Sequence, residues 1–186
     1  MITAKEGTNF YKALTYLQPA VGHARYIWWT SGAVPEGPPA YAANKPAPDI
    51  ETVEKGGIFC AGVPNLMLRR VGKRVATYGN HNFDGGTLAY QEYFRGFSEP
   101  FDLDRALHVA ANERSGVLIG RPFRSSLDQG HVAVVLPSGY LLQSYDEANG
   151  NPGLNWNIPT AVSVRYWTPT YMVRPENWID YKGDEF

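Results

Sequence analysis

The chain has 186 residues, of which 44% are hydrophobic and 19% charged, so a single domain with a substantial core is expected over residues 1–186. Its formal net charge of -1 offers no electrostatic basis for binding nucleic acid or an anionic membrane surface. A single cysteine excludes an internal disulfide, and no apolar run has the length that membrane insertion requires. The first residues lack the charged start and apolar stretch of a signal peptide, so export through a leader is not expected.

The N-terminal third predicts one helix and a long loop. Apolar residues recur at helical spacing over residues 9–17, and Thr8 or Asn9 can cap this helix. The aromatic run at residues 26–29 is expected to be extended. Residues 32–57 are rich in proline and glycine and predict a long loop, of the kind that often frames a site.

The lone cysteine follows this loop, at the start of a predicted helix. Apolar spacing favours a helix over residues 60–71, with Gly72 as its stop. Pro64 is tolerated only near a helix start, because a proline deeper inside removes a hydrogen bond and clashes. This places Cys60 in the first turn, where backbone N–H groups are expected to lower the pKa of the thiol and to stabilise an oxyanion.

The second half of the chain predicts two further helices and then short strands. The helices are expected at residues 88–94 and 102–112, and the strands at residues 117–119, 131–136, 140–145 and 162–167. Helices first and an antiparallel sheet second are typical of an α+β domain.

A histidine opens one of these strands and can serve the thiol. His131 follows a glycine and begins an apolar strand, and the next strand returns toward it as a hairpin. That return brings Gln143, Tyr145 and Glu147 within reach of His131. A thiol nucleophile needs a base of this kind, and the base needs a third group that orients its ring. Metal binding is not expected, because no histidine or cysteine pair has the spacing of metal ligands.

Three segments, in this order, resemble the NlpC-type cell-wall peptidases of the papain-like superfamily. They are Tyr26-Ile27-Trp28-Trp29, Phe59-Cys60-Ala61-Gly62 and Gly130-His131-Val132-Ala133-Val134-Val135. The resemblance implies a papain-like fold, with N-terminal helices packed on an antiparallel sheet. It implies Cys60 as nucleophile, His131 as general base and acid, and Gln143 as the orienting residue. Phe59 and Ala61 depart from the family, which has Asp and Ser at these positions.

The same resemblance implies the substrate and the remaining site residues. The substrate is expected to be an amide bond in the stem peptides of peptidoglycan, cleaved through a thioester by a monomer that needs no cofactor. Tyr26 would approach the oxyanion, and Trp28, Trp29 and Asp146 would line the substrate groove. The expected setting is a bacteriophage lysin, held in the host cytoplasm before its release to the wall, or a virion-associated protein; a secreted enzyme is less expected.

Three alternatives remain open at this level. The related CHAP amidases share the Gly-His-Val-Ala strand and would use Glu147 or Asn149 as the third residue. A non-catalytic wall-associated or virion module with the same fold would explain Phe59 and Ala61. Acyl transfer would use the same thiol and histidine, with a nucleophile other than water resolving the thioester.

Overall fold

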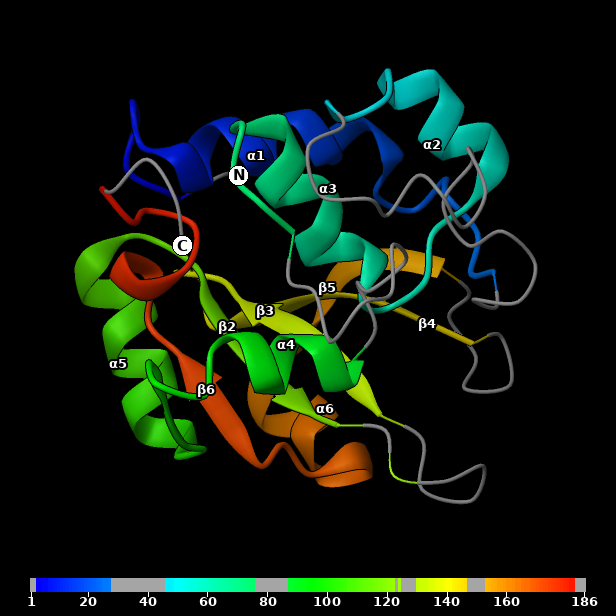
Figure 1. Cartoon of the computed structure of the whole chain (residues 1–186). Helices are drawn as coiled ribbons and strands as arrows, with labels where there is room; N and C mark the ends of the chain where they lie inside the picture. Colours follow the sequence, from blue (N-terminus) through cyan, green and yellow to red (C-terminus); the bar gives the residue numbers. More distant parts are fainter. Residues whose placement is uncertain are drawn as a thin grey trace.

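The computed structural model describes residues 3–27, 46–75, 87–122, 124, 130–146 and 153–182. They form an antiparallel sheet with helices on both of its faces (Figure 1). The sheet has six strands in the order β1-β6-β2-β3-β4-β5, and every neighbouring pair is antiparallel. The α+β class predicted from the sequence is therefore confirmed, with α1 and α3 on one face of the sheet and α6 on the other.

The strands and helices have the following bounds. The strands are β1 (Ser98–Pro100), β2 (Val117–Arg121), β3 (His131–Val135), β4 (Tyr140–Tyr145), β5 (Gly153–Pro159) and β6 (Tyr171–Val173). The α-helices are α1 (Asn9–Leu17), α2 (Ile50–Gly56), α3 (Gly62–Arg70), α4 (Thr87–Tyr93), α5 (Leu103–Glu113) and α6 (Thr160–Trp167). Two 3-10 turns, η1 (Gln18–Ala20) and η5 (Pro175–Asn177), complete the described elements.

Local sequence signals place several of these elements correctly. The Thr8 hydroxyl caps α1 by accepting the N–H of Tyr11 at 3.2 Å, as predicted. The β3–β4 hairpin has the predicted strands, and its register pairs Val134 with Leu142. Gly72 follows α3 with a φ of +74°, a left-handed conformation that ends a helix at little cost for glycine.

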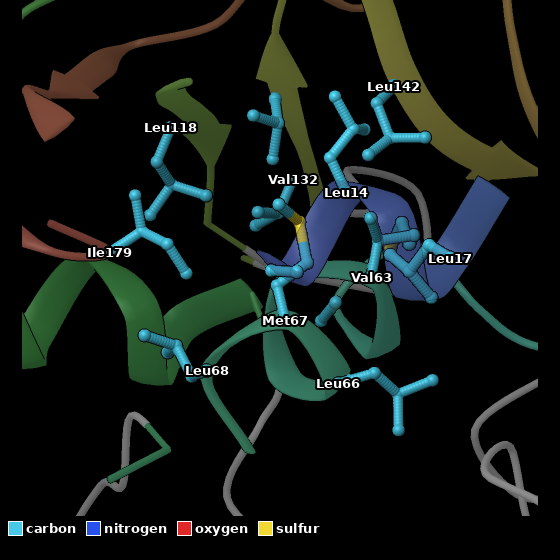
Figure 2. Close-up of a cluster of buried hydrophobic side chains, with 14 of the residues drawn as sticks. Leu14, Leu17, Val63, Leu66, Met67, Leu68, Leu118, Val132, Leu142 and Ile179 are labelled. Carbon is cyan, nitrogen blue, oxygen red and sulfur yellow. The ribbon is translucent and has the colours of Figure 1, made fainter. Parts of the chain in front are cut away.

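Hydrophobic side chains fill both faces of the sheet, so its central strands are covered on each side. Figure 2 shows the larger cluster, in which Leu14 of α1 and Val63 and Met67 of α3 lie on the side of their helices that faces Leu118 of β2, Val132 of β3 and Leu142 of β4. A second cluster lies on the opposite face, where α5 and the Trp167 ring of α6 cover Ala133 and the other outward residues of β2 and β3. Alternate residues of β3 therefore belong to different clusters, which is the two-residue period of a strand buried on both faces.

The predicted strand over residues 162–167 is wrong, because these residues form most of helix α6. Val162, Val164 and Tyr166 alternate with other residues and imitate a strand pattern. The residues that α6 buries are instead Thr160, Ser163 and Trp167, at the three- and four-residue spacing of a helix face. The strands β1, β5 and β6 were not predicted; β1 and β6 have only three residues each, too few to show a period.

The predicted loop over residues 32–57 is also wrong in part. Its last residues form α2, which Asp49 caps by accepting the N–H of Thr52 at 2.8 Å. Residues 28–45 lie outside the described part of the chain, and so do Trp28 and Trp29. Within the described ranges, the helices are all too short or too polar to span a bilayer.

Candidate active site

Cys60 lies in a turn immediately before α3. The helix begins at Gly62 with Ala61 as its N-cap, so the thiol precedes the helix by two residues. The prediction that Cys60 lies in the first turn of the helix is therefore wrong. Pro64 is then the third residue of the helix, where its missing N–H leaves no gap in the hydrogen-bond ladder. The Cys60 carbonyl accepts the N–H of Val63 at 3.2 Å, so the turn runs directly into the helix.

The segment that leads into Cys60 is fixed by hydrogen bonds to two other parts of the fold. Ile58 donates its N–H to the carbonyl of Arg25 at 2.9 Å, and its own carbonyl accepts the hydroxyl of Ser144 on β4 at 2.7 Å. Gly57 has a φ of +88°, and a Cβ there would lie 2.7 Å from the Arg25 carbonyl oxygen. Gly57 thus marks a close approach of two chain segments just before Cys60.

The thiol is more deeply buried than its place before a helix suggested. Cys60 is 6% exposed, and burial raises its pKa to about 11. The backbone N–H groups of Val132, Ala61 and Cys60 itself oppose this by hydrogen-bonding the sulfur, but their effect is smaller. The expected lowering of the thiol pKa is therefore wrong for the free protein, because desolvation outweighs the N–H groups. At neutral pH Cys60 is a thiol.

His131 and Gln143 are joined by a hydrogen bond. The Nε2 atom of His131 lies 3.0 Å from Oε1 of Gln143, which can only accept, so Nε2 carries the proton and Nδ1 keeps a lone pair. Burial, aided by the positive charge of Arg121, lowers the pKa of His131 to about 4, and the Gln143 bond opposes this shift. The imidazole is therefore neutral at neutral pH, in the tautomer that makes Nδ1 the base.

The thiol lies beside the first residues of β3, the strand that His131 opens. Val132, whose N–H approaches the Cys60 sulfur, directly follows His131 in this strand. The structure thus brings the three residues predicted from the sequence, Cys60, His131 and Gln143, to one end of the β3–β4 hairpin.

Tyr26 lies within electrostatic reach of both Cys60 and Asp146. Burial raises the pKa of the Tyr26 phenol, and the charges of Cys60 and then Asp146 raise it further. Tyr26 also pairs with Ile58 in a parallel bridge, two residues before the thiol. The two predicted tryptophans and the alternative third residues, Glu147 and Asn149, lie outside the described residues.

Three residues near this site were not identified from the sequence. Ser163 and Trp167 of α6 approach Gln143 and His131, and they were missed because the helix was read as a strand. Tyr171 of β6 was missed because its strand is too short to predict. It is 4% exposed, and burial followed by the charge of Cys60 raises the pKa of its phenol.

Tyr171 occupies space that a glycine leaves free. Gly120 pairs with Tyr171 on one side and with Val132 on the other, so these three residues form one row across the sheet. A Cβ at Gly120 would overlap the Tyr171 hydroxyl, which has no hydrogen-bond partner within the described part of the chain. An unpaired polar group thus lies buried within electrostatic reach of the thiol.

Among the residues that the structure describes, histidine, cysteine, aspartate and glutamate side chains form no group that could hold a metal ion.

Comparisons with known proteins give a distant structural likeness. No protein-family model matches the chain, and no curated protein matches its sequence. A solved structure, described as the NlpC/p60 domain of the peptidoglycan hydrolase SagA, aligns with 88% of this chain and 96% of its own, at 15% identity and a TM-score of 0.46. A likeness at this level says nothing about activity, which has to be inferred from the side chains of the site.

Proposed function

We propose that this protein is a cysteine amidohydrolase in which Cys60 is the nucleophile, His131 the general base and acid, and Gln143 the residue that orients the imidazole. One observation carries the proposal. The N–H of Val132 lies close enough to the Cys60 sulfur to lower the thiol pKa, and the preceding residue, His131, is hydrogen-bonded to Gln143 at 3.0 Å. A thiol, a base and an orienting group at one point are the components that nucleophilic acyl chemistry requires.

The pKa values determine how the first step proceeds. With a thiol pKa of about 11 and an imidazole pKa of about 4, both groups are neutral in the free protein. The thiol proton therefore moves to Nδ1 of His131 as the sulfur bonds to the amide carbon, and no thiolate is held in advance. The backbone N–H groups of Cys60 and Ala61, which now face the sulfur, are the donors nearest to the developing oxyanion.

The remaining steps return every group to its starting state. The imidazolium of His131 gives its proton to the amide nitrogen, and the C–N bond breaks. The amine leaves, and the acyl group remains on Cys60 as a thioester. Water then adds to the thioester while His131 takes one of its protons. The carboxylic acid departs, and the proton returns to the sulfur.

The proposed substrate is an amide in the stem peptides of bacterial peptidoglycan. This rests on the likeness of the segments around Tyr26, Cys60 and His131 to those of NlpC-type enzymes. Action as a bacteriophage lysin or a virion-associated enzyme stays a prediction of the sequence pattern.

Digestion of purified peptidoglycan tests this function. The wild-type chain is expected to release fragments whose masses identify the amide that is cut, and Cys60→Ala is expected to release none while keeping the circular dichroism of the wild type. Peptidoglycans that differ in the stem-peptide diamino acid would define specificity. Equal release by wild type and Cys60→Ala contradicts the assignment of the nucleophile.

A second candidate is a non-catalytic module with the same fold. The deep burial of Cys60 and its raised pKa favour it, since an inert structural cysteine has these properties. This candidate predicts that neither the wild type nor Cys60→Ala cleaves any peptidoglycan, while both sediment with the intact polymer.

A further inference from the structure

The Gln143 amide is held on both of its sides. Its Oε1 atom faces His131 Nε2 at 3.0 Å, and its Nε2 atom donates to the hydroxyl of Ser163 on α6 at 3.1 Å. An amide that turned over would present its NH₂ group to the histidine and would favour the tautomer with the proton on Nδ1. The partner of the NH₂ group therefore matters for the chemistry of His131.

Ser163 is itself tied to a tryptophan that reaches the histidine. The indole N–H of Trp167 donates to the Ser163 hydroxyl at 3.3 Å. The same indole packs edge-to-face with the His131 ring, with the ring centroids 4.5 Å apart and the planes at 75°. His131, Gln143, Ser163 and Trp167 thus form a closed ring of contacts that begins and ends at the imidazole.

The helical conformation of α6 makes this ring possible. Ser163 and Trp167 are four residues apart, so on a helix they lie on one face, one turn from each other. Gln143 is 3% exposed, Ser163 6% and Trp167 9%, so little water reaches these hydrogen bonds and each group depends on the others for a partner.

We propose that Ser163 and Trp167 are positioning residues, which hold the Gln143 amide in the orientation that keeps the proton of His131 on Nε2 and its lone pair on Nδ1. In this role neither residue exchanges a proton or bonds to the substrate; Ser163 acts through Gln143, and Trp167 acts through Ser163 and the His131 ring. The inference rests on the proposed function for its effect on catalysis, but the state of the imidazole can be measured without any substrate.

Nitrogen NMR of histidine-labelled protein measures that state directly. In the wild type, Nε2 of His131 is expected to carry the proton. In Ser163→Ala the amide loses its acceptor, and a mixture of the two tautomers is expected. Ser163→Thr, which keeps the hydroxyl, should restore the wild-type spectrum. Tyr166→Phe is the matched control on α6, because Tyr166 is 85% exposed and should leave the spectrum unchanged.

Kinetics on peptidoglycan supply the second readout. Ser163→Ala is expected to lower kcat about tenfold with little change in KM, since part of the contribution of a general base is lost while substrate contacts remain. Trp167→Phe tests the same ring of contacts if Ser163→Ala does not fold, because it removes the indole N–H and keeps an aromatic edge near His131. A folded Ser163→Ala protein with the wild-type tautomer overturns the proposal, and so does a folded Trp167→Phe protein with an unchanged spectrum and kcat.

The two inferences fail separately. A wild type that cleaves no peptidoglycan contradicts the proposed function, while the tautomer shift in Ser163→Ala still tests the role of α6. If the wild type is fully active and Ser163→Ala keeps the wild-type tautomer, the proposed function is supported and the positioning role of Ser163 is contradicted.

Discussion

The thiol of Cys60 should resist deprotonation in the folded protein, and its reaction with an alkylating agent measures this directly. Burial raises its pKa to about 11, against an ordinary value of about 8.5. The difference corresponds to about 3 kcal/mol in favour of the neutral form. At pH 8, about one folded molecule in a thousand would hold a thiolate, against about a quarter of unfolded molecules.

Iodoacetamide labelling followed by mass spectrometry is the assay. The chain has one cysteine, so the mass gain reports Cys60 alone. At pH 8 the folded protein is expected to react roughly two-hundredfold more slowly than the same chain in guanidinium chloride, from the thiolate fractions alone. The folded rate should keep rising about tenfold for each pH step of one, up to about pH 10, while the unfolded rate levels off above about pH 9.

A midpoint for the folded protein at or below about pH 8.5 would refute this reasoning, because the N–H groups beside the sulfur would then outweigh desolvation. His131→Gln separates the two ways in which that result can arise. If the midpoint of the wild type is low and that of His131→Gln is high, the wild type holds a preformed thiolate–imidazolium pair. If both midpoints are low, the backbone N–H groups alone stabilise the thiolate.

Three further predictions concern stability. Because burial lowers the pKa of His131 from about 6.5 to about 4, its neutral form supports folding above pH 6.5, and up to about 3 kcal/mol of unfolding free energy should be lost as the pH falls to 4. Urea titrations at several pH values measure this, and His131→Gln should flatten the slope; parallel slopes in both proteins contradict it. Tyr171→Phe removes a buried hydroxyl that lacks a partner within the described residues, so it should raise the unfolding free energy by about 1 kcal/mol, whereas a clear loss would reveal a partner. Gly120→Ala places a methyl against the Tyr171 hydroxyl and should cost about 2 kcal/mol, while Gly96→Ala, with no atom within 4 Å of its new Cβ, is the control and should cost far less.

The parts of the site that the sequence predicted depend on neighbouring residues in the chain. Helix α1 and its Thr8 cap follow from local spacing, and the hairpin that carries His131 and Gln143 follows from strand alternation around one turn. The hairpin limited the partners of His131 to Gln143, Tyr145 and Glu147, and the family resemblance selected Gln143, which the structure places 3.0 Å from the imidazole.

The amino-acid sequence by itself determined which residues are proposed to carry the chemistry: one thiol, a histidine at the start of an apolar strand and an amide on the returning strand. It could not determine the protonation of the thiol, because desolvation depends on segments far apart in the chain that pack around Cys60. Nor could it place Ser163 and Trp167, because the alternating valines and tyrosine of this segment predicted a strand. The segment is a helix, which buries Ser163 and Trp167 on one face. Local periodicity thus indicated the residues of the proposed site, and tertiary burial set their pKa values and their hydrogen-bond partners.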